Sequence, residues 1–305
     1  MGMIHRNDNM LLRIAQGDAY AMAAEYCKRH PEEPEAIELL EFKRYLTHPS
    51  YHKLPAGTYT DDTQMSIAVA EALIEDPQPS GVAFAAHFLE AFKRDERDGY
   101  SRGFQSVLEK CGTLSEFLHT IIPNSTKNGA AMRSVPLGVL STPHCVLRMA
   151  EKQAVVTHAT QQGVDSSKAI GLMSHYALRD ERELIDMTGW LTSWLPVCEK
   201  FREPWVGPVV SKCDHSPWDV GMNTAWAVHT LLTTQTTLLG IMTQVLEWGG
   251  DTDSVAAIAW GIASCRMRED LPTFFEDDLE KENGSTFGAP FLKQLGKQLM
   301  DAYET

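Results

Sequence analysis

The chain has 305 residues, 43% of them hydrophobic and 22% charged, which is enough to build a substantial core in one large domain or two ordinary ones. A formal net charge of -14 argues against non-specific binding to the phosphate backbone of nucleic acid, because proteins that bind nucleic acid usually present a concentrated basic face. The cysteines are widely spaced and form no C-x-x-C pair, a pattern typical of reduced thiols. Without a signal-peptide core or an apolar stretch of membrane-spanning length, the sequence predicts a cytoplasmic protein that does not enter a membrane.

Apolar residues recur with a helical period along most of the chain. The segment 206–210 is extended in composition, but Pro204 and Pro208 make it a loop, so the pattern contains no convincing strand. The connecting segments are short, and none marks a domain boundary. The sequence therefore predicts one compact all-α domain over residues 1–305. The expected helices cover residues 10–28, 64–75, 82–93, 131–140, 147–161, 166–178, 183–195, 224–232, 239–248, 255–268 and 291–303.

Two short acidic motifs, YTDDT at residues 59–63 and GGDTDS at residues 249–254, each stand directly before a long apolar-periodic run. Each motif is therefore expected to lead into a helix. One Asp per motif can be an ordinary helix cap, since its carboxylate accepts hydrogen bonds from the first free backbone N–H groups. The second carboxylate of each motif is surplus to that role, and close carboxylates repel unless a cation or a proton lies between them.

The side chains of these motifs offer carboxylate and hydroxyl oxygens without His or Cys. Such a set suits Mg²⁺ or Mn²⁺ rather than Zn²⁺. We therefore predict that the two motifs form a two-metal site, with paired helix caps as the alternative.

The first long helix contains a third acidic position, Asp18, among the small residues Gly17, Ala19 and Ala21. Small residues let another helix or a ligand approach the backbone closely, and Asp18 interrupts a face that could otherwise pack. From the residues alone, a buried structural acid paired with an Arg or a backbone N–H is favoured over a ligand-binding role.

A fourth segment, NGAAMRSVPLG at residues 128–138, places glycine and alanines at the start of an expected helix. Exposed N–H donors at the positive end of a helix dipole form a ready anion site, for example for a phosphate. Arg133 is a possible charge partner for that anion or for a motif carboxylate. A small-residue helix crossing explains the same pattern equally well.

Two other groups of potential ligands are set aside. The triplet Cys213, Asp214 and His215 has no matching pair at zinc-like spacing, and adjacent residues seldom converge on one ion. The acidic run at residues 276–280 is interpreted as a solvated helix face or loop.

In chain order these segments resemble the ADP-ribosylglycohydrolases, a family that includes dinitrogenase-reductase-activating glycohydrolases and ADP-ribosyl-arginine and ADP-ribosyl-serine hydrolases. The ordered co-occurrence of the motifs is more specific than any one of them. The matching segments are GDA at 17–19 with Glu25, TDDT at 60–63, YSRGF at 100–104, NGAAMR at 128–133, TH at 157–158 and GDTDS at 250–254.

The resemblance implies an all-α orthogonal multi-helix bundle with a binuclear Mg²⁺ or Mn²⁺ centre between helix termini. In the family the last motif position is usually Thr, and Ser254 keeps the hydroxyl oxygen. The implied metal ligands are Thr60, Asp61, Asp62, Asp251, Asp253 and Ser254.

The resemblance also implies which residues act on the substrate. Glu25 ranks first and Asp98 second as general base, and Asp62 and Asp253 combine metal binding with a catalytic role. The implied substrate-binding residues are Asp18, Asn128, Gly129, Ala130, Met132, Arg133, His158, Gly249 and Gly250.

The leading functional hypothesis is a metal-dependent hydrolase that removes ADP-ribose from a modified protein or a small adduct, reversing mono-ADP-ribosylation. Cleavage at the ribose C1 passes through an oxocarbenium-like transition state to which a water must be delivered. One alternative is a non-catalytic relative that binds ADP-ribose or serves a structural role, and another is a metal phosphohydrolase of a different nucleotide. The acidic net charge favours a protein or small-molecule substrate over nucleic acid, and the sequence leaves the oligomeric state open.

Overall fold

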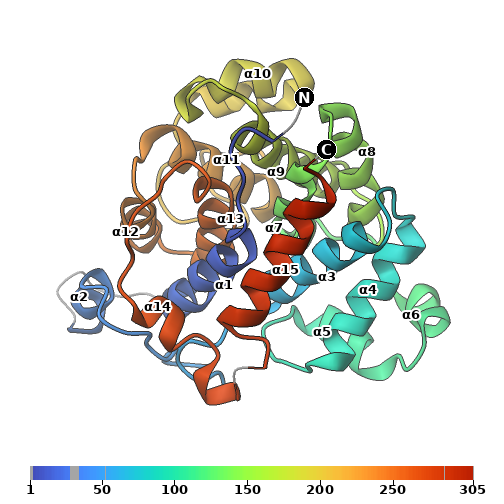
Figure 1. Cartoon of the computed structure of the whole chain (residues 1–305), viewed down its shortest axis with the longest axis horizontal. Helices are drawn as coiled ribbons and strands as arrows, with labels where there is room; N and C mark the ends of the chain where they lie inside the picture. The colour runs from blue at the N-terminus through green and yellow to red at the C-terminus, as the bar shows by residue number, and fades with distance from the viewer. Residues whose placement is uncertain (1–2, 28–33, 52, 285, 305) are drawn as a thin grey trace.

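The computed structural model of the protein describes residues 3–27, 34–51, 53–284 and 286–304, and its regular structure is helical (Figure 1). Among these residues, strand-like pairing is limited to two isolated bridges, Asn124 with His158 and Val209 with Gly250. The all-α prediction is confirmed. The α-helices are α1 Met10–Ala21, α2 Pro34–Leu40, α3 Asp61–Glu75, α4 Gly81–Arg94, α5 Arg102–Lys110, α6 Leu114–Thr120, α7 Gly129–Met132, α8 Pro143–Ala154, α9 Gln161–Arg179, α10 Met187–Trp194, α11 Val220–Thr234, α12 Leu238–Trp248, α13 Thr252–Ala263, α14 Phe274–Asp277 and α15 Ala289–Ala302. Five 3-10 helices complete the described structure: η1 Met22–Ala24, η2 Val135–Val139, η3 Leu184–Asp186, η4 Pro196–Arg202 and η5 Lys281–Asn283.

The centre of the molecule is the pair α1 and α13. Every residue of α13 is buried, and in α1 only Arg13 is partly exposed, so both helices lie inside the bundle rather than on its surface. They cross at Gly17, where an added Cβ would come within 2.7 Å of the Ala256 carbonyl oxygen. The Thr252 hydroxyl also donates to the Ala21 carbonyl at 2.8 Å. This close crossing fixes the carboxyl end of α1 against the start of α13.

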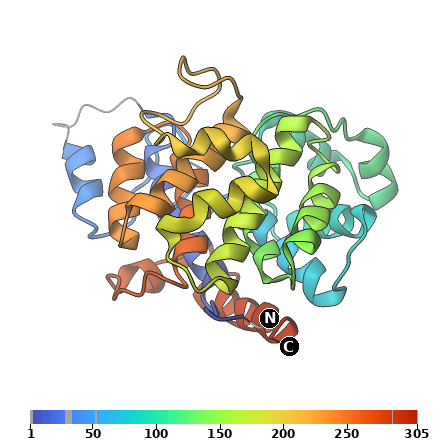
Figure 2. The same ribbon diagram turned by 90° about the horizontal axis from the view of Figure 1, so that it is seen from above.

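Helix α3 packs on both members of this pair, and α15 packs on α1 and α3; Figure 1 shows α15 lying alongside α1. The ends of the described chain meet on this side, because Arg6 forms ion pairs with Asp301 and Glu304; the view in Figure 2 shows the same closeness. Among the described residues, none of the helices combines the length and the apolar character that crossing a bilayer requires.

Several predicted helices differ from the structure. The helix expected over 131–140 is instead the short α7 followed by the 3-10 helix η2, because Pro136 has no N–H to donate and its ring disfavours a continuous α-helix. The helix expected over 147–161 ends at Ala154, and Thr160 caps a new helix, α9, by accepting a hydrogen bond from the Gly163 N–H.

The first predicted helix, 10–28, is also shorter than expected. It ends at Ala21, continues as the 3-10 turn η1, and gives way at Glu25 to backbone with φ -54° and ψ 122°. Lys28, its expected last residue, lies outside the described residues. The early end matters because it leaves Glu25 on a turn rather than on a helix face, close to the start of α13.

Candidate active site

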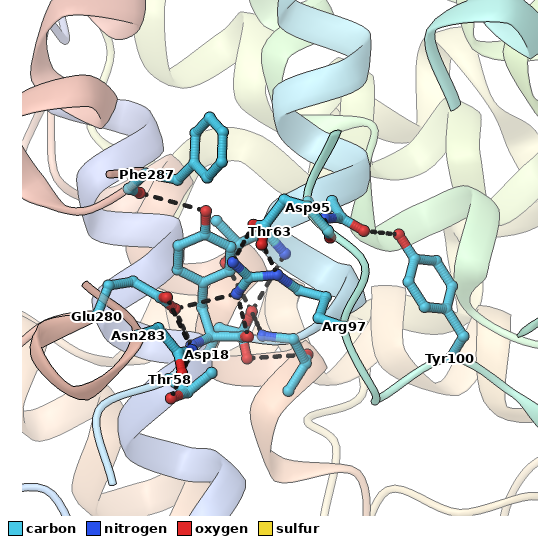
Figure 3. Close-up of polar contacts among 12 residues, drawn as sticks. Asp18, Thr58, Thr63, Asp95, Arg97, Tyr100, Glu280, Asn283 and Phe287 are labelled. Carbon is cyan, nitrogen blue, oxygen red and sulfur yellow. Dashed lines mark hydrogen bonds and ion pairs between the residues drawn. The ribbon is translucent and has the colours of Figure 1, made fainter. Parts of the chain in front are cut away.

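The amino end of α3 is capped by a residue from another helix. Asp18, on α1, is fully buried, and its Oδ2 accepts hydrogen bonds from the Thr60 N–H at 2.9 Å and the Thr63 N–H at 3.1 Å (Figure 3). Its two oxygens also accept from the hydroxyls of Thr60 and Thr63, at 3.0 and 2.6 Å. Asp18 thus accepts the hydrogen bonds that an N-cap side chain would normally accept from the first turn of α3. Asp61 and Asp62 are therefore not needed to cap this helix.

At the amino end of α13, too, the motif carboxylate at the cap position does not cap the helix. Asp251 stands at the N-cap position, but its side chain makes no cap hydrogen bond to the helix. Its Oδ2 instead accepts from the Tyr26 hydroxyl and from Asn128 Nδ2, each at 3.1 Å. Neither acidic motif is therefore explained by helix capping, which was the alternative to a metal site.

The motif before α13 is held in place by its glycines. Gly249 and Gly250 have φ of 71° and 82°, in the left-handed region that glycine adopts without strain. The backbone here pairs with residue 209: the Val209 N–H donates to Gly249 O at 3.2 Å, and the Asp251 N–H donates to Val209 O at 2.9 Å. A Cβ on Gly250 would lie 2.2 Å from the Val209 oxygen. The two backbone segments could therefore not approach this closely if residue 250 were not a glycine.

Three carboxylates from the turn after η1 and the start of α13 converge. Ligand oxygens of Glu25, Asp251 and Asp253 all lie within 4.8 Å of one another. The structure therefore places Glu25, which the sequence suggested as general base, among the groups that could hold a cation. Asp61, Asp62 and Ser254 line the same cavity, so the two motifs face each other across it.

Burial raises the pKa of every acid in this group, and repulsion by neighbouring carboxylates adds to the rise for Glu25, Asp61, Asp62 and Asp253. Burial, followed by the charges of Asp251 and Asp61, raises the pKa of Glu25 to about 8. Burial and the nearby Asp18 raise the pKa of Asp61 to about 7. Burial and the charges of Asp18 and Asp61 raise the pKa of Asp62 well above its ordinary range, and burial with the charges of Glu25 and Asp251 does the same for Asp253. Burial also raises the pKa of Asp251, while hydrogen bonds to its carboxylate oppose the rise. In the absence of positive charge, these acids cannot all be ionised at neutral pH.

The arrangement fits a divalent cation. Oδ1 of Asp62 and Oδ1 of Asp253 are buried and have no hydrogen-bond partner among the described residues. A buried carboxylate oxygen without a donor is costly, and a hard cation satisfies it. The oxygen-only set of carboxylates and hydroxyls is the one that Mg²⁺ and Mn²⁺ prefer.

The acids form the floor of a cavity of about 580 Å³, a volume in the range of small-molecule sites. Its walls combine polar residues with apolar side chains such as Phe104, Val107 and Ile122. Of the residues predicted for the site, those that line the cavity are Glu25, Asp61, Asp62, Asn128, Gly129, Met132, Arg133, His158, Asp251, Asp253 and Ser254. The other predicted residues are described by the structure but do not line it: Asp18, Thr60, Asp98, Ala130, Gly249 and Gly250.

The segment around α7 forms one wall of the cavity. His158 packs on Gly129, where an added Cβ would meet its ring at 2.8 Å, and its Nδ1 lies 2.6 Å from the Thr157 hydroxyl oxygen. Burial and the charge of Arg133 lower the pKa of His158 to about 3, so this ring is neutral. The wall therefore offers Asn128 and a neutral imidazole rather than a positive charge from His158.

Arg133 contributes to the same cavity lining but is almost fully buried. Its Nη2 donates to Gln153 O at 3.0 Å and to the Thr157 hydroxyl at 2.8 Å, and its guanidinium carbon lies 4.2 Å from the Phe88 ring centroid. Burial lowers its pKa to about 9. These contacts hold the guanidinium in place, where its positive charge acts on the neighbouring Asp61.

The segment after α4 contacts the first motif through residues next to Asp98 rather than through Asp98 itself. Asp98 Oδ1 accepts from Gln105 Nε2 at 3.0 Å on the surface. Gly99, with φ 127°, lies against the motif, and a Cβ there would be 3.0 Å from Thr60 Cβ and 3.2 Å from Asp61 Oδ1. A glycine is needed at this position because the backbone passes directly over the motif.

Arg97 and Glu280 form a buried ion pair that supports the first motif (Figure 3). Arg97 Nη1 lies 3.0 Å from Glu280 Oε1 and donates to the Tyr59 carbonyl at 2.8 Å, while the Tyr59 N–H donates to Glu280 Oε1 at 2.9 Å. The interpretation of residues 276–280 as solvated is wrong for Glu280, which is 2% exposed. The sequence did not reveal this burial because the cationic partner of Glu280, Arg97, is far away in the chain and comes close only after folding.

Sequence reasoning also missed two tyrosines that line the cavity. Tyr26 and Tyr51 line it and are each about half exposed, and Arg102 and Lys127 contribute positive charge. Tyr26 directly follows Glu25, so its place beside the acids could have been inferred from the chain order. Tyr51 could not, because the long connection between α2 and α3 has no regular pattern.

The fold and this site together define an all-α protein whose ligand-sized cavity ends in a cluster of carboxylates at helix termini. The family model for ADP-ribosylglycohydrolase matches residues 6–305, and the chain belongs to that family. The resemblance seen in the sequence is confirmed.

Comparison with individual proteins supports the same assignment. ADP-ribosylhydrolase ARH3 of Xenopus tropicalis is 31% identical over 134 residues, covering 41% of this chain and 38% of the relative. The human ARH3 is 29% identical over 141 residues, covering 44% of this chain and 39% of the relative. The matched segments thus span about two fifths of the length of these curated relatives. A solved structure titled "ADP-ribosylglycohydrolase-related protein complex" superposes with a TM-score of 0.68 over 98% of both chains at 19% identity, which shows a shared fold.

Proposed function

We propose that this protein hydrolyses the glycosidic bond between ADP-ribose and a modified acceptor, reversing mono-ADP-ribosylation. The observation that carries the proposal is the cavity floor, where Glu25, Asp61, Asp62, Asp251 and Asp253 meet with two unpartnered carboxylate oxygens. Membership of the ADP-ribosylglycohydrolase family supports the choice of ADP-ribose as the bound group. A protein side chain or a small adduct is the proposed acceptor, ahead of nucleic acid, because the chain carries a net charge of -14.

Two Mg²⁺ or Mn²⁺ ions are the proposed cofactors. Their ligands would come from Thr60, Asp61 and Asp62 on one side and from Asp251, Asp253 and Ser254 on the other, and the Glu25 carboxylate lies close to Asp251 and Asp253. When bound, such ions would orient the ribose hydroxyls and lower the pKa of a water molecule.

The remaining work falls to the side chains of this chain. Glu25 is the acid that we assign to proton transfer, because it lies on a turn at the cavity floor, whereas Asp98 faces the surface. Asn128 and the N–H groups at the start of α7 would orient the phosphates or the distal ribose, and Met132 and His158 would shape that wall. Asp18 supports the first motif from behind.

The test is release of free ADP-ribose from arginine-, serine- and nucleic-acid-linked substrates, with Mg²⁺ or with a chelator. We expect release that depends on the metal and is lost in Asp61→Asn and Asp253→Asn, while Asp277→Asn, an exposed acid on α14, behaves as wild type. Release of AMP or phosphate instead would identify a phosphohydrolase. Binding of ADP-ribose without turnover of any substrate would make the protein a binding module.

A further inference from the structure

Tyr26 has a backbone conformation that its residue type disfavours. Its φ is 47°, in the left-handed region where the Cβ of a bulky side chain is crowded. The residue is 53% exposed, so burial of its ring in the core does not compensate for this strain. A strained residue beside a functional site is held there by specific contacts.

Two such contacts are present, and both reach the motif before α13. The Tyr26 N–H donates to Gly250 O at 2.8 Å, and the Tyr26 hydroxyl donates to Asp251 Oδ2 at 3.1 Å. The left-handed conformation lets the backbone and the side chain of one residue bind two consecutive residues of the motif. Tyr26 therefore joins the turn that carries Glu25 to the motif that carries Asp251.

The contact with Asp251 selects one of its oxygens. Asn128 Nδ2 donates to the same Oδ2 at 3.1 Å, so two neutral donors from different segments fix one side of the carboxylate. Oδ1 is the oxygen that neither of these donors occupies, and Asp251 is one of the three acids whose oxygens converge. Donors of this kind, which bind a metal ligand but not the metal, set the orientation and the affinity of metal sites.

We propose that Tyr26 is a positioning residue, which orients the Asp251 carboxylate for a divalent cation and holds the Glu25 turn against it. This inference rests on the proposed function in one respect, that Asp251 is a metal ligand. The role needs the hydroxyl of the side chain, because the backbone bond to Gly250 is available to any residue except proline.

The test is the affinity for Mn²⁺, measured by isothermal titration calorimetry on the metal-free full chain. We expect Tyr26→Phe to bind Mn²⁺ about 10-fold more weakly than wild type, the lower end of the effect of such outer donors. Tyr26→Gly, which relieves the backbone strain and keeps the N–H, is expected to lose at least as much affinity. The control is Tyr303→Phe, which removes another tyrosine hydroxyl whose hydrogen bond goes to Leu73 O at 2.9 Å, away from the cavity.

A second readout separates positioning from a general loss of structure. If Tyr26→Phe weakens ADP-ribose release only through the metal, then excess Mn²⁺ restores the rate, whereas a misfolded variant is not rescued. The inference is overturned if wild type binds Mn²⁺ and either Tyr26 variant binds it equally well. If wild type itself binds no Mn²⁺, the proposed metal site fails and the inference fails with it.

Discussion

The Thr63 hydroxyl on α3 donates a hydrogen bond of 2.6 Å to Oδ2 of Asp18 on α1. Together with the two backbone N–H groups that donate to the same oxygen, this bond makes an acid from one helix the cap of another. The acids of the first motif are then free to face the cavity.

Asp18→Asn should destabilise the fold. An amide keeps one acceptor oxygen for the donors that meet at Oδ2, but it places an NH₂ group against the Thr60 hydroxyl and removes the negative charge that strengthens these hydrogen bonds. The expected loss is about 2 kcal/mol in the free energy of unfolding, because hydrogen bonds to a charged group are among the stronger ones. Urea denaturation of metal-free protein measures it, with Asp277→Asn as the exposed control. An unchanged midpoint would show that Asp18 does not support α3 and would favour its alternative role in substrate binding.

Alanine at two adjacent glycines should have unequal effects. Both Gly249 and Gly250 have positive φ, so each substitution adds backbone strain on the order of 1–3 kcal/mol. Only at Gly250 does the new Cβ also clash with the Val209 oxygen; at Gly249 it meets nothing within 4 Å. We expect Gly250→Ala to cost at least about 1 kcal/mol more than Gly249→Ala in thermal or urea unfolding. Equal losses would mean that the pairing with residue 209 does not hold the motif.

Stabilisation by Mg²⁺ should grow with pH. Folding raises the pKa of Glu25 to about 8 and of Asp61 to about 7, above their ordinary values of 4.5 and 3.8. Between those values the metal-free folded state binds more protons than the unfolded chain, so these acids lower its stability as pH rises toward 8. A divalent cation binds the ionised acids and offsets that loss. The shift in Tm on adding Mg²⁺ is therefore expected to be larger at pH 8 than at pH 6, and a shift that is independent of pH would contradict the site.

Asp253→Asn provides the matched variant for that experiment. Removing one charge from the cluster relieves repulsion, so the metal-free variant is expected to melt at a higher temperature than metal-free wild type at pH 8. The Mg²⁺-dependent shift should shrink or vanish, because Oδ1 of Asp253 is one of the unpartnered oxygens. A variant that is both less stable without metal and still stabilised by Mg²⁺ would argue against repulsion between these acids.

His175 should make the protein sensitive to acid. Its Nδ1–H donates to Gly138 O at 3.2 Å, and burial lowers its pKa from 6.5 to about 4. Below pH 6.5 the imidazole of His175 is therefore protonated in the unfolded chain but not in the folded state. The free energy of unfolding falls as pH is lowered toward 4. Between pH 7 and pH 5 wild type is expected to lose about 2 kcal/mol more than His175→Gln, which cannot titrate. Parallel pH profiles of unfolding for the two proteins would refute this role.

The sequence was a good guide where a local pattern determines the structure. Two carboxylates directly before an apolar run fix both the helix start and the side that the acids occupy, which is why both motifs were found. The alternation of apolar residues likewise located the long helices. It failed at Pro136, where the apolar pattern continues although the α-helix cannot.

Partners across the fold were beyond the reach of the sequence. That Asp18 caps α3, and that Arg97 pairs with Glu280 beneath Tyr59, depends on segments that meet only after folding. Glu25 could be recognised as a functional acid, but its closeness to Asp251 and Asp253 depends on where α1 ends. The assignment of one domain, the two ions and the cellular compartment stay predictions.

The pairing of residue 209 with the second motif has a consequence for how new specificities could arise. The loop between η4 and α11 reaches the cavity at Ser211, and the hydrogen bonds by which Val209 of this loop holds the motif come from main-chain atoms. Outward-facing side chains of this loop can therefore be exchanged without disturbing the backbone that positions Asp251. The protein thus separates a fixed centre from a rim that can be diversified, which makes this loop the natural place to build libraries for altered acceptor choice.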